Sequence, residues 1–181
     1  MATMRGGDKV AEKLRVLVAK LDKPGVVRVG FLENAKYQDG TPVAMVAAIQ
    51  DGGAPSRGIP PRPFFRNMIA DHKAEWPAQI AAVLKDNDYD AEKTLGIMGA
   101  NIAGRLRESI INTNEPPLSP VTVMLRGMRS QAKYKGKAFG DIIGEAVARV
   151  AAGKTNYGAS TKALIDTDHM YESVDYEIKT K

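Results

Sequence analysis

Three prolines within four positions, Pro60, Pro61 and Pro63, constrain the fold of this chain more than any other sequence feature. A proline fixes φ at about −65° and removes a backbone donor. The stretch around them therefore cannot form a central strand or the interior of a helix. Pro63 differs, because its locked φ suits the first turn of a helix and apolar residues follow it at helical spacing. We predict an extended proline arm over residues 53–63 that leads directly into a helix.

The end of this proline arm is apolar, which indicates a surface that engages another protein. Docking such an arm costs little entropy, because proline has already restricted the unfolded chain. One short helix offers too little surface to bury both Phe64 and Phe65, so we expect the arm to project and to pack partly on a neighbouring subunit. The residues predicted for this interface are Ile59, Pro60, Pro61, Arg62, Pro63, Phe64 and Phe65.

Length and composition indicate one domain and narrow the classes of function. With 181 residues, 44% of them hydrophobic, the chain is long enough for a single domain, 1–181, with its own core. The sequence has no cysteine, which excludes disulfides, thiolate metal sites and a cysteine nucleophile. It also has no apolar run of membrane-spanning length, so we expect no membrane partner. The net charge of +5 is a mild basic bias that indicates solubility more than polyanion binding.

Hydrophobic periodicity predicts an α+β fold. The expected helices cover about 8–21, 42–50, 63–85 with a bend at Trp76-Pro77, 90–110, a segment that starts at Ser119-Pro120, and 139–152. Strands are expected at 26–32 and 174–178, where apolar and polar residues alternate. The simplest closure pairs these two strands into a small antiparallel or mixed sheet, packed by several helices. We expect the helix that begins at Asp90 to cross the sheet through Leu95, Met98, Ile102 and Leu106.

The search for chemistry finds no convincing catalytic, cofactor-binding or metal-binding residues. Asp166, Asp168 and His169 lie close enough in sequence to suggest metal ligands, but such a cluster more often caps a helix, and we predict a cap. Residues 153–155 resemble the end of a phosphate-binding loop, yet Ala148 stands where that loop needs a glycine. We therefore expect no cofactor and no enzyme, and a hydrolase is the weakest of the functions considered.

One basic tract stands out at the start of the last third of the chain. Between residues 120 and 137 the sequence carries five cations and no acidic residue: Arg126, Arg129, Lys133, Lys135 and Lys137. One interpretation is a solvated, flexible segment. The other is a surface that meets DNA phosphates or an acidic partner, where lysine and arginine neutralise charge without reading sequence. The interleaved Met124, Leu125 and Met128 favour a protein partner, because phosphates make no use of apolar surface.

Three short motifs, in a fixed order, carry a family resemblance. They are Ile59-Pro60-Pro61-Arg62-Pro63-Phe64, then Leu118-Ser119-Pro120-Val121-Thr122, then Leu164-Ile165-Asp166-Thr167 ahead of Ser173, Val174 and the closing strand. This order resembles the neck and tail-completion proteins of tailed bacteriophages, also described as minor tail or virion-morphogenesis proteins. The chain departs from the family pattern at three places: at Gln50-Asp51-Gly52, where the family has an acidic residue, an aromatic residue and a glycine; at Asp168, where it has a glycine; and over 139–160, which is longer.

The resemblance implies a structural role without catalysis. The expected protein is a virion component that forms a homo-hexameric ring in the neck or at the head-proximal end of the tail, where it completes the tail or joins it to the head. Its expected partners are copies of itself, neighbouring connector, tail-terminator or tail-tube proteins and, through weak non-specific contact, genomic DNA. It would assemble in the host bacterial cytoplasm, and 120–162 would be an insertion or peripheral region. The leading alternative is a basic nucleic-acid-binding accessory protein.

Overall fold

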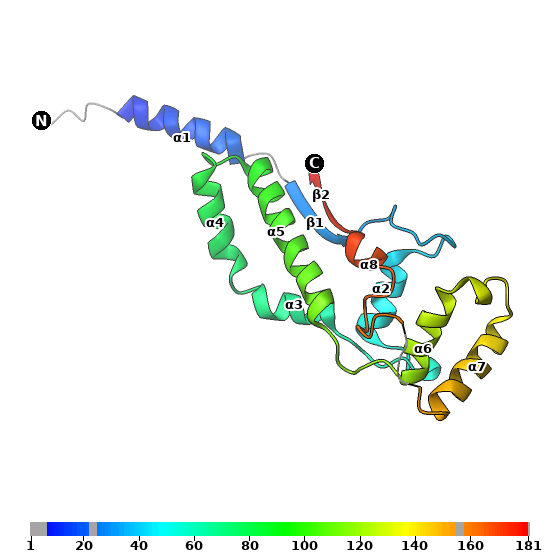
Figure 1. Cartoon of the computed structure of the whole chain (residues 1–181). Helices are drawn as coiled ribbons and strands as arrows, with labels where there is room; N and C mark the ends of the chain where they lie inside the picture. Colours follow the sequence, from blue (N-terminus) through cyan, green and yellow to red (C-terminus); the bar gives the residue numbers. More distant parts are fainter. Residues whose placement is uncertain (1–6, 22–24, 155–157, 181) are drawn as a thin grey trace, which may run out of the picture.

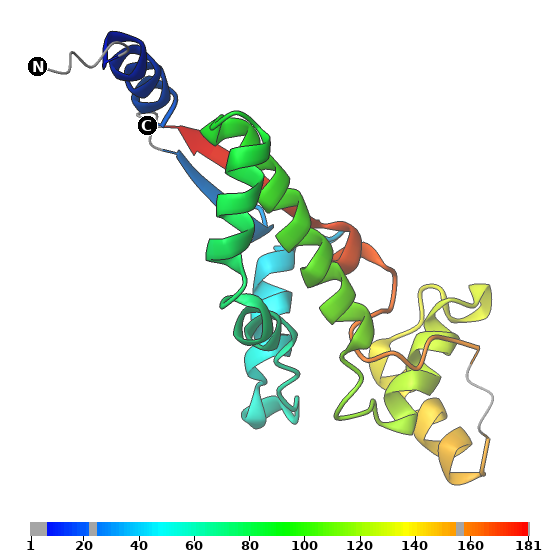
Figure 2. The ribbon, with the colours of Figure 1, turned by 90° about the vertical axis from the view of Figure 1, so that its left-hand side faces the viewer.

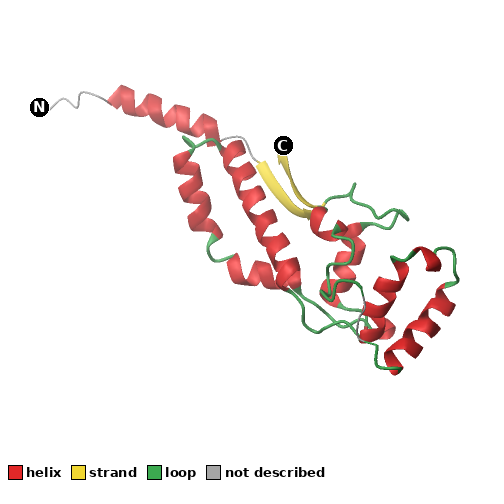
Figure 3. Cartoon of the chain, in the orientation of Figure 1, coloured by secondary structure: helices red, strands yellow, loops and turns green. Residues whose placement is uncertain are grey.

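The computed structural model describes residues 7–21, 25–154 and 158–180. These residues form a mixed α+β fold that is about 60% helical, with eight helices and a small antiparallel sheet of two strands, which confirms the predicted fold class (Figures 1 and 3). In chain order the elements are α1 Gly7–Leu21, β1 Gly25–Phe31, α2 Val43–Gly52, η1 Pro55–Arg57, α3 Phe64–His72, α4 Trp76–Asp86, α5 Ala91–Asn112, α6 Pro120–Arg129, η2 Ala132–Tyr134, α7 Phe139–Ala151, α8 His169–Glu172 and β2 Val174–Thr180.

The sheet pairs the strand that follows α1 with the strand at the end of the described chain. Strands β1 and β2 pair antiparallel, from Gly25 opposite Thr180 to Phe31 opposite Val174. This is the predicted closure of the first strand on the last. Figure 2 shows the two strands lying side by side behind α5. Because β1 and β2 are far apart in sequence, their pairing also constrains the positions of the elements between them.

Helix α5 packs across one face of this sheet, as predicted. Its first turn is capped by Asp90, whose carboxylate accepts a hydrogen bond from the backbone N–H of Lys93 at 3.0 Å. Met98 and Leu106 on its sheet-facing side are buried. The approach is closest at Gly99, where a Cβ atom would lie 2.5 Å from the ring of Tyr176. The helix therefore comes this near to the sheet only because residue 99 has no side chain.

We expect Gly99→Ala to destabilise the fold by about 1–3 kcal/mol, because the added methyl group overpacks the contact between α5 and the sheet. The matched control is Gly104→Ala on the same helix, since a Cβ at Gly104 would meet nothing within 4 Å. That control should gain up to about 1 kcal/mol from better helix propensity. Urea denaturation of both variants measures the difference. Equal stabilities for the two variants would show that α5 does not depend on this close approach.

The main core lies where α2, α3 and α5 meet α8 and the start of β2. Its fully buried members come from segments far apart in sequence: Val43, Ala47, Phe64, Met68, Ala103, Leu106, Ile110, Leu164, Met170 and Val174. Phe31 from β1 packs against Phe64 edge to face, with ring centroids 6.4 Å apart. One hydrophobic core therefore unites the proline-containing segment with both strands at the Phe31–Val174 end of the sheet.

A second, smaller core lies between α6 and α7, at the end of the molecule opposite α1 (Figure 1). Its buried members are Met124, Met128, Tyr134, Ile142 and Ala146. The Tyr134 hydroxyl donates to Glu145 Oε1 at 2.6 Å and accepts from Arg149 at 2.8 Å. The hydrogen bond from Tyr134, followed by the contact with Arg149, lowers the pKa of the Glu145 carboxyl. Most of the segment predicted as peripheral, 120–162, thus packs around a core of its own; residues 155–157 within it lie outside the described ranges.

The predicted single helix over 63–85 is wrong. The chain forms two helices, α3 and α4, separated at residues 73–75. Pro77 lies in the first turn of α4, where its missing N–H leaves no intrahelical bond unmade. A proline at this position favours a new helix start over a bend, and the change of direction lets both helices pack on α5.

Candidate functional site

The proline-containing segment does not project from the chain. Residues 54 and 59 exchange two backbone hydrogen bonds, of 2.8 and 3.1 Å, around the short turn η1, so the start of the segment folds back on itself. Arg62 is 3% exposed and Phe64 is fully buried. The prediction of a projecting arm is therefore wrong, and these two side chains are not available to a neighbouring subunit. For Ile59, Pro60, Pro61, Pro63 and Phe65, which are exposed or partly buried, contact with another subunit stays a prediction.

Arg62 joins three parts of the chain. Its backbone N–H donates to the carbonyl of Gln50 at 2.8 Å, and its guanidinium donates to the Gln50 side chain at 3.3 Å. The same guanidinium donates to the carbonyl of Pro116 at 2.9 Å and contacts that of Pro117 at 3.5 Å. A buried arginine needs hydrogen-bond acceptors such as these carbonyls to offset its desolvation. Arg62 therefore ties the end of α2 to the linker between α5 and α6.

Arg126 holds the segment ahead of α8 in the same way, through hydrogen bonds to backbone carbonyls. Its guanidinium donates to the carbonyls of Lys162 at 2.7 Å, Ala163 at 3.0 Å and Ile165 at 3.1 Å. Its Nε lies 3.4 Å from the Asp166 carboxylate. The side chain is only 13% exposed, so its predicted role in contacting DNA or an acidic partner is wrong. Arg126 stabilises the chain's own loop.

The two arginines lie near each other and together form what we call the arginine junction, defined as Arg62, Arg126 and the carbonyl groups that they bind. Burial lowers the pKa of Arg62, and the charge of Arg126 lowers it further. The junction brings together the three motifs that carry the family resemblance, because Arg62 belongs to the first, Pro116 and Pro117 immediately precede the second, and Arg126 binds the third. Ser119 of the second motif caps α6 by accepting from Thr122 N–H at 3.1 Å.

A polar cavity of about 330 Å³ opens beside the junction, between Arg126 and α8. In its wall the rings of Tyr37 and His169 lie 4.9 Å apart, and His169 Nε2 is 2.9 Å from the carbonyl of Lys36. Burial, and then the nearby charge of Asp166, raises the pKa of the Tyr37 hydroxyl, which keeps it neutral. These contacts hold a loop against α8 and place no activated base beside a nucleophile.

The acidic residues of the third motif do not form the predicted helix cap. Asp166 pairs with Arg126. Asp168 takes the cap position of α8 with φ 57°, a left-handed conformation, and its side chain makes no capping bond. This is the position at which the resembled family has glycine, the residue that best tolerates such a φ. Across residues 7–21, 25–154 and 158–180, no cluster of three or more histidine, aspartate or glutamate side chains could hold a metal ion.

The rest of the basic tract lies at the last residue of α6 and on the turn that leads to α7. Lys133 and Lys137 place their ammonium groups 4.7 and 5.2 Å from the centre of the Tyr134 ring. Arg129 and Lys135 are exposed. These four cations keep their predicted role as a contact for DNA or an acidic partner. The expectation that the apolar residues of the tract favour a protein partner is wrong, however, because Met124 and Met128 are buried in the second core.

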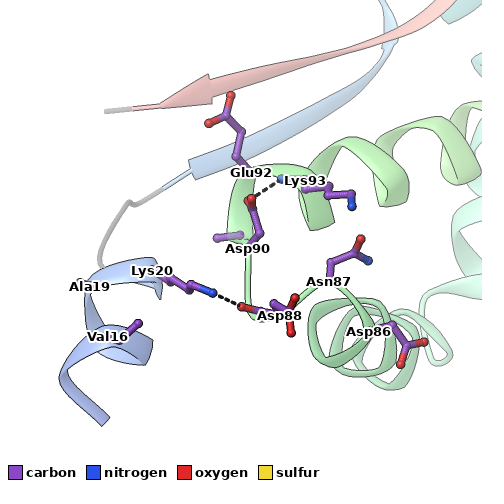
Figure 4. A pocket seen from close by; sticks show the side chains of 10 residues that line it. Val16, Ala19, Lys20, Asp86, Asn87, Asp88, Asp90, Glu92 and Lys93 are labelled. Carbon is purple, nitrogen blue, oxygen red and sulfur yellow. Dashed lines mark hydrogen bonds between the residues drawn. The ribbon is translucent and has the colours of Figure 1, made fainter. Parts of the chain in front are cut away.

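Helix α1 presents the largest unpartnered apolar surface of the described residues. Its apolar stripe recurs every three or four positions, and its members are 46–63% exposed: Val10, Leu14, Val18 and Leu21. Another side of the helix, with Val16 and Lys20, lines a cavity of about 650 Å³ against the turn between α4 and α5 (Figure 4). There Lys20 donates to the backbone carbonyl of Asp88 at 2.9 Å. The sequence reveals this stripe, but only the structure shows that the described residues leave it exposed.

None of the described helices is both long and apolar enough to cross a membrane. A scan against protein-family models matches none, and searches of curated proteins and of solved structures give no significant match.

Proposed function

We propose that this chain is a structural virion protein of a tailed bacteriophage, which forms a homo-oligomeric ring in the neck or at the head-proximal end of the tail. The observation that carries the proposal is the arginine junction. The three motifs that resemble those of tail-completion proteins are separated by about fifty residues each in sequence, yet Arg62 of the first binds the prolines just before the second, and Arg126, on the helix that the second begins, binds the third. Motifs that meet at the arginine junction support a fold in common with the resembled proteins better than three unconnected short sequence matches would.

Two features of the surface support assembly over catalysis. The exposed stripe of α1 is apolar surface that a second protein would bury with a gain in free energy. The cavity beside the junction holds Tyr37, Thr167 and His169, but the His169 Nε2 atom lies 2.9 Å from the backbone carbonyl of Lys36, a contact that holds a loop and activates no hydroxyl. In this proposal the partners are copies of the chain and the proteins above and below the ring, and no cofactor takes part.

The test is deletion of the gene from the phage or prophage that carries it, followed by electron microscopy of the released particles. We expect tails that fail to join heads, or tails that lack a finished head-proximal end. Supplying the intact chain from a plasmid should restore joined particles. Infectious, normally joined particles from the deletion strain would contradict the proposal.

A basic nucleic-acid-binding accessory protein is the second candidate, favoured by four exposed cations at the end of α6 and on the turn that follows it: Arg129, Lys133, Lys135 and Lys137. These groups offer charge without a base-reading element, so any DNA contact should be weak and independent of sequence. Titration with duplex DNA at near-physiological salt separates the two functions. Tight, sequence-selective binding would favour the nucleic-acid function over the ring.

A further inference from the structure

The two-stranded sheet leaves both of its outer edges open. Within the described residues β1 hydrogen-bonds to β2 alone, and neither strand has a second neighbour. An open edge presents backbone N–H and C=O groups that can pair with another chain. Helix α5 contacts both strands and lies across one face of the sheet. A sheet of only two strands also gains stability when a third is added.

The edge of β1 lacks the features with which proteins usually protect an open edge. Its seven residues contain one charged side chain, Arg28, and no proline. All seven pair with β2 in an uninterrupted register, so the strand has no bulge against its partner. Edges of monomeric proteins are commonly blunted by lysines, prolines or bulges. With neither a proline nor a bulge, the outer edge of β1 can accept a further strand.

Charge indicates which edge of a second copy fits β1. Inside the chain Arg28 lies directly opposite Glu177 on the solvent-facing side of the sheet, with Nη1 and Oε1 3.5 Å apart. Strand β2 also carries Asp175 on this side. If β1 met β2 of another copy, Arg28 would again face a carboxylate. If β1 instead paired with β1 of another copy around Arg28, or β2 with β2 around Glu177, two like charges would lie directly opposite each other, which is unfavourable.

The same register can be repeated across the edge without changing the strands. In an antiparallel ladder the N–H and C=O of one residue point to the same side, and this side alternates along the strand. Where the backbone N–H and C=O groups of two opposite residues point away from each other within one chain, they point outward from the open edges, toward the strand of a neighbouring copy. The repeat also aligns the apolar row of β1, which includes Val27 and Val29, with Tyr176 and Ile178 of the other copy.

We infer that β1 of one copy pairs antiparallel with β2 of the next copy, with Arg28 opposite Glu177 of that copy. This interface rests on the proposed function, because it is the contact that would build the ring. It joins two different surfaces, so it is head to tail, the type of contact that generates closed rings when the rotation between copies closes. Main-chain pairing of this kind is a recurrent mode of protein recognition.

The absence of native cysteine allows a direct test by disulfide cross-linking. Arg28→Cys and Glu177→Cys are made as separate single variants and co-expressed with different affinity tags. Both side chains are partly exposed, 58% and 37%, and their surface ion pair contributes little to folding, so both variants should fold. After mild oxidation we expect a covalent dimer that carries both tags. Neither variant expressed alone should form a covalent dimer.

The matched control pairs Glu177→Cys with Lys135→Cys, an exposed residue on the turn between α6 and α7; no cross-link is expected there. Native mass spectrometry of the parent chain separates the outcomes. A ring without the Arg28–Glu177 cross-link would overturn this interface and leave the proposed function standing. A dimer formed by Arg28→Cys alone would show symmetric edge pairing and overturn the head-to-tail contact. A parent chain that stays monomeric, with no cross-link, would overturn both.

Discussion

Replacing Phe64 by alanine should lower the free energy of unfolding by about 3–5 kcal/mol, the usual cost of removing a buried phenylalanine. Phe64 has no exposed surface and lies in the main core, edge to face with Phe31 and with Phe65. Its backbone carbonyl also accepts a hydrogen bond from Ser109 on α5 at 2.7 Å. The loss of the ring would therefore leave a cavity where three segments of the chain meet. Urea denaturation followed by circular dichroism measures the change.

The matched control is Phe65→Ala. Phe65 is only partly buried, with its ring against Gly30 at the end of β1, so the control should cost clearly less than Phe64→Ala. If Phe64→Ala left stability unchanged and abolished only assembly, the side chain would have to leave the core to meet a neighbour. That result would restore the projecting arm and contradict the buried position of Phe64.

Replacing Arg126 by glutamine should destabilise the chain by about 2–3 kcal/mol, the contribution of hydrogen bonds from a charged donor. Glutamine is too short and has too few N–H groups to bind the carbonyls of residues 162, 163 and 165 together. It also removes the charge that pairs with Asp166. Hydrogen exchange should increase first in the segment ahead of α8, because this segment depends most directly on the arginine.

Arg129→Gln on the same helix provides the control for charge. Arg129 is exposed, so its replacement should change stability by no more than about 0.5 kcal/mol. The pair also separates structure from DNA contact: Arg129→Gln should weaken any binding to duplex DNA while leaving the fold intact. If Arg126→Gln and Arg129→Gln changed the free energy of unfolding equally, the stabilising role of Arg126 in the arginine junction would be contradicted.

Most of the element order was predictable because strong local signals mark it. Asp90 and Ser119 cap the helices that they were expected to cap, and each accepts a backbone hydrogen bond from three residues later. Alternating patterns at the two ends of the chain gave both strands and, by elimination, their pairing. The helix over 63–85 was misjudged because a proline in a helical pattern can either bend a helix or begin one.

The roles of single side chains were much harder to predict. Arg62 and Arg126 look like surface cations in the sequence, since arginine is rarely buried unless paired. Most of their partners are backbone carbonyls between 34 and 55 residues away, which have no sequence signal. Met124 and Met128 were assigned to the surface for the same reason: the helix that covers them, α7, follows only later in the chain. Burial is a tertiary property, so a local pattern does not fix it.

Native mass spectrometry of the purified full-length chain tests the central claim, that this is a ring-forming protein, most directly. The account predicts one dominant closed oligomer, with six copies expected, that persists on dilution and gives ring-shaped particles in electron micrographs. A closed ring would bury the open sheet edges of every copy. A chain that is monomeric at all concentrations tested, with both sheet edges and the α1 stripe exposed, would contradict the account.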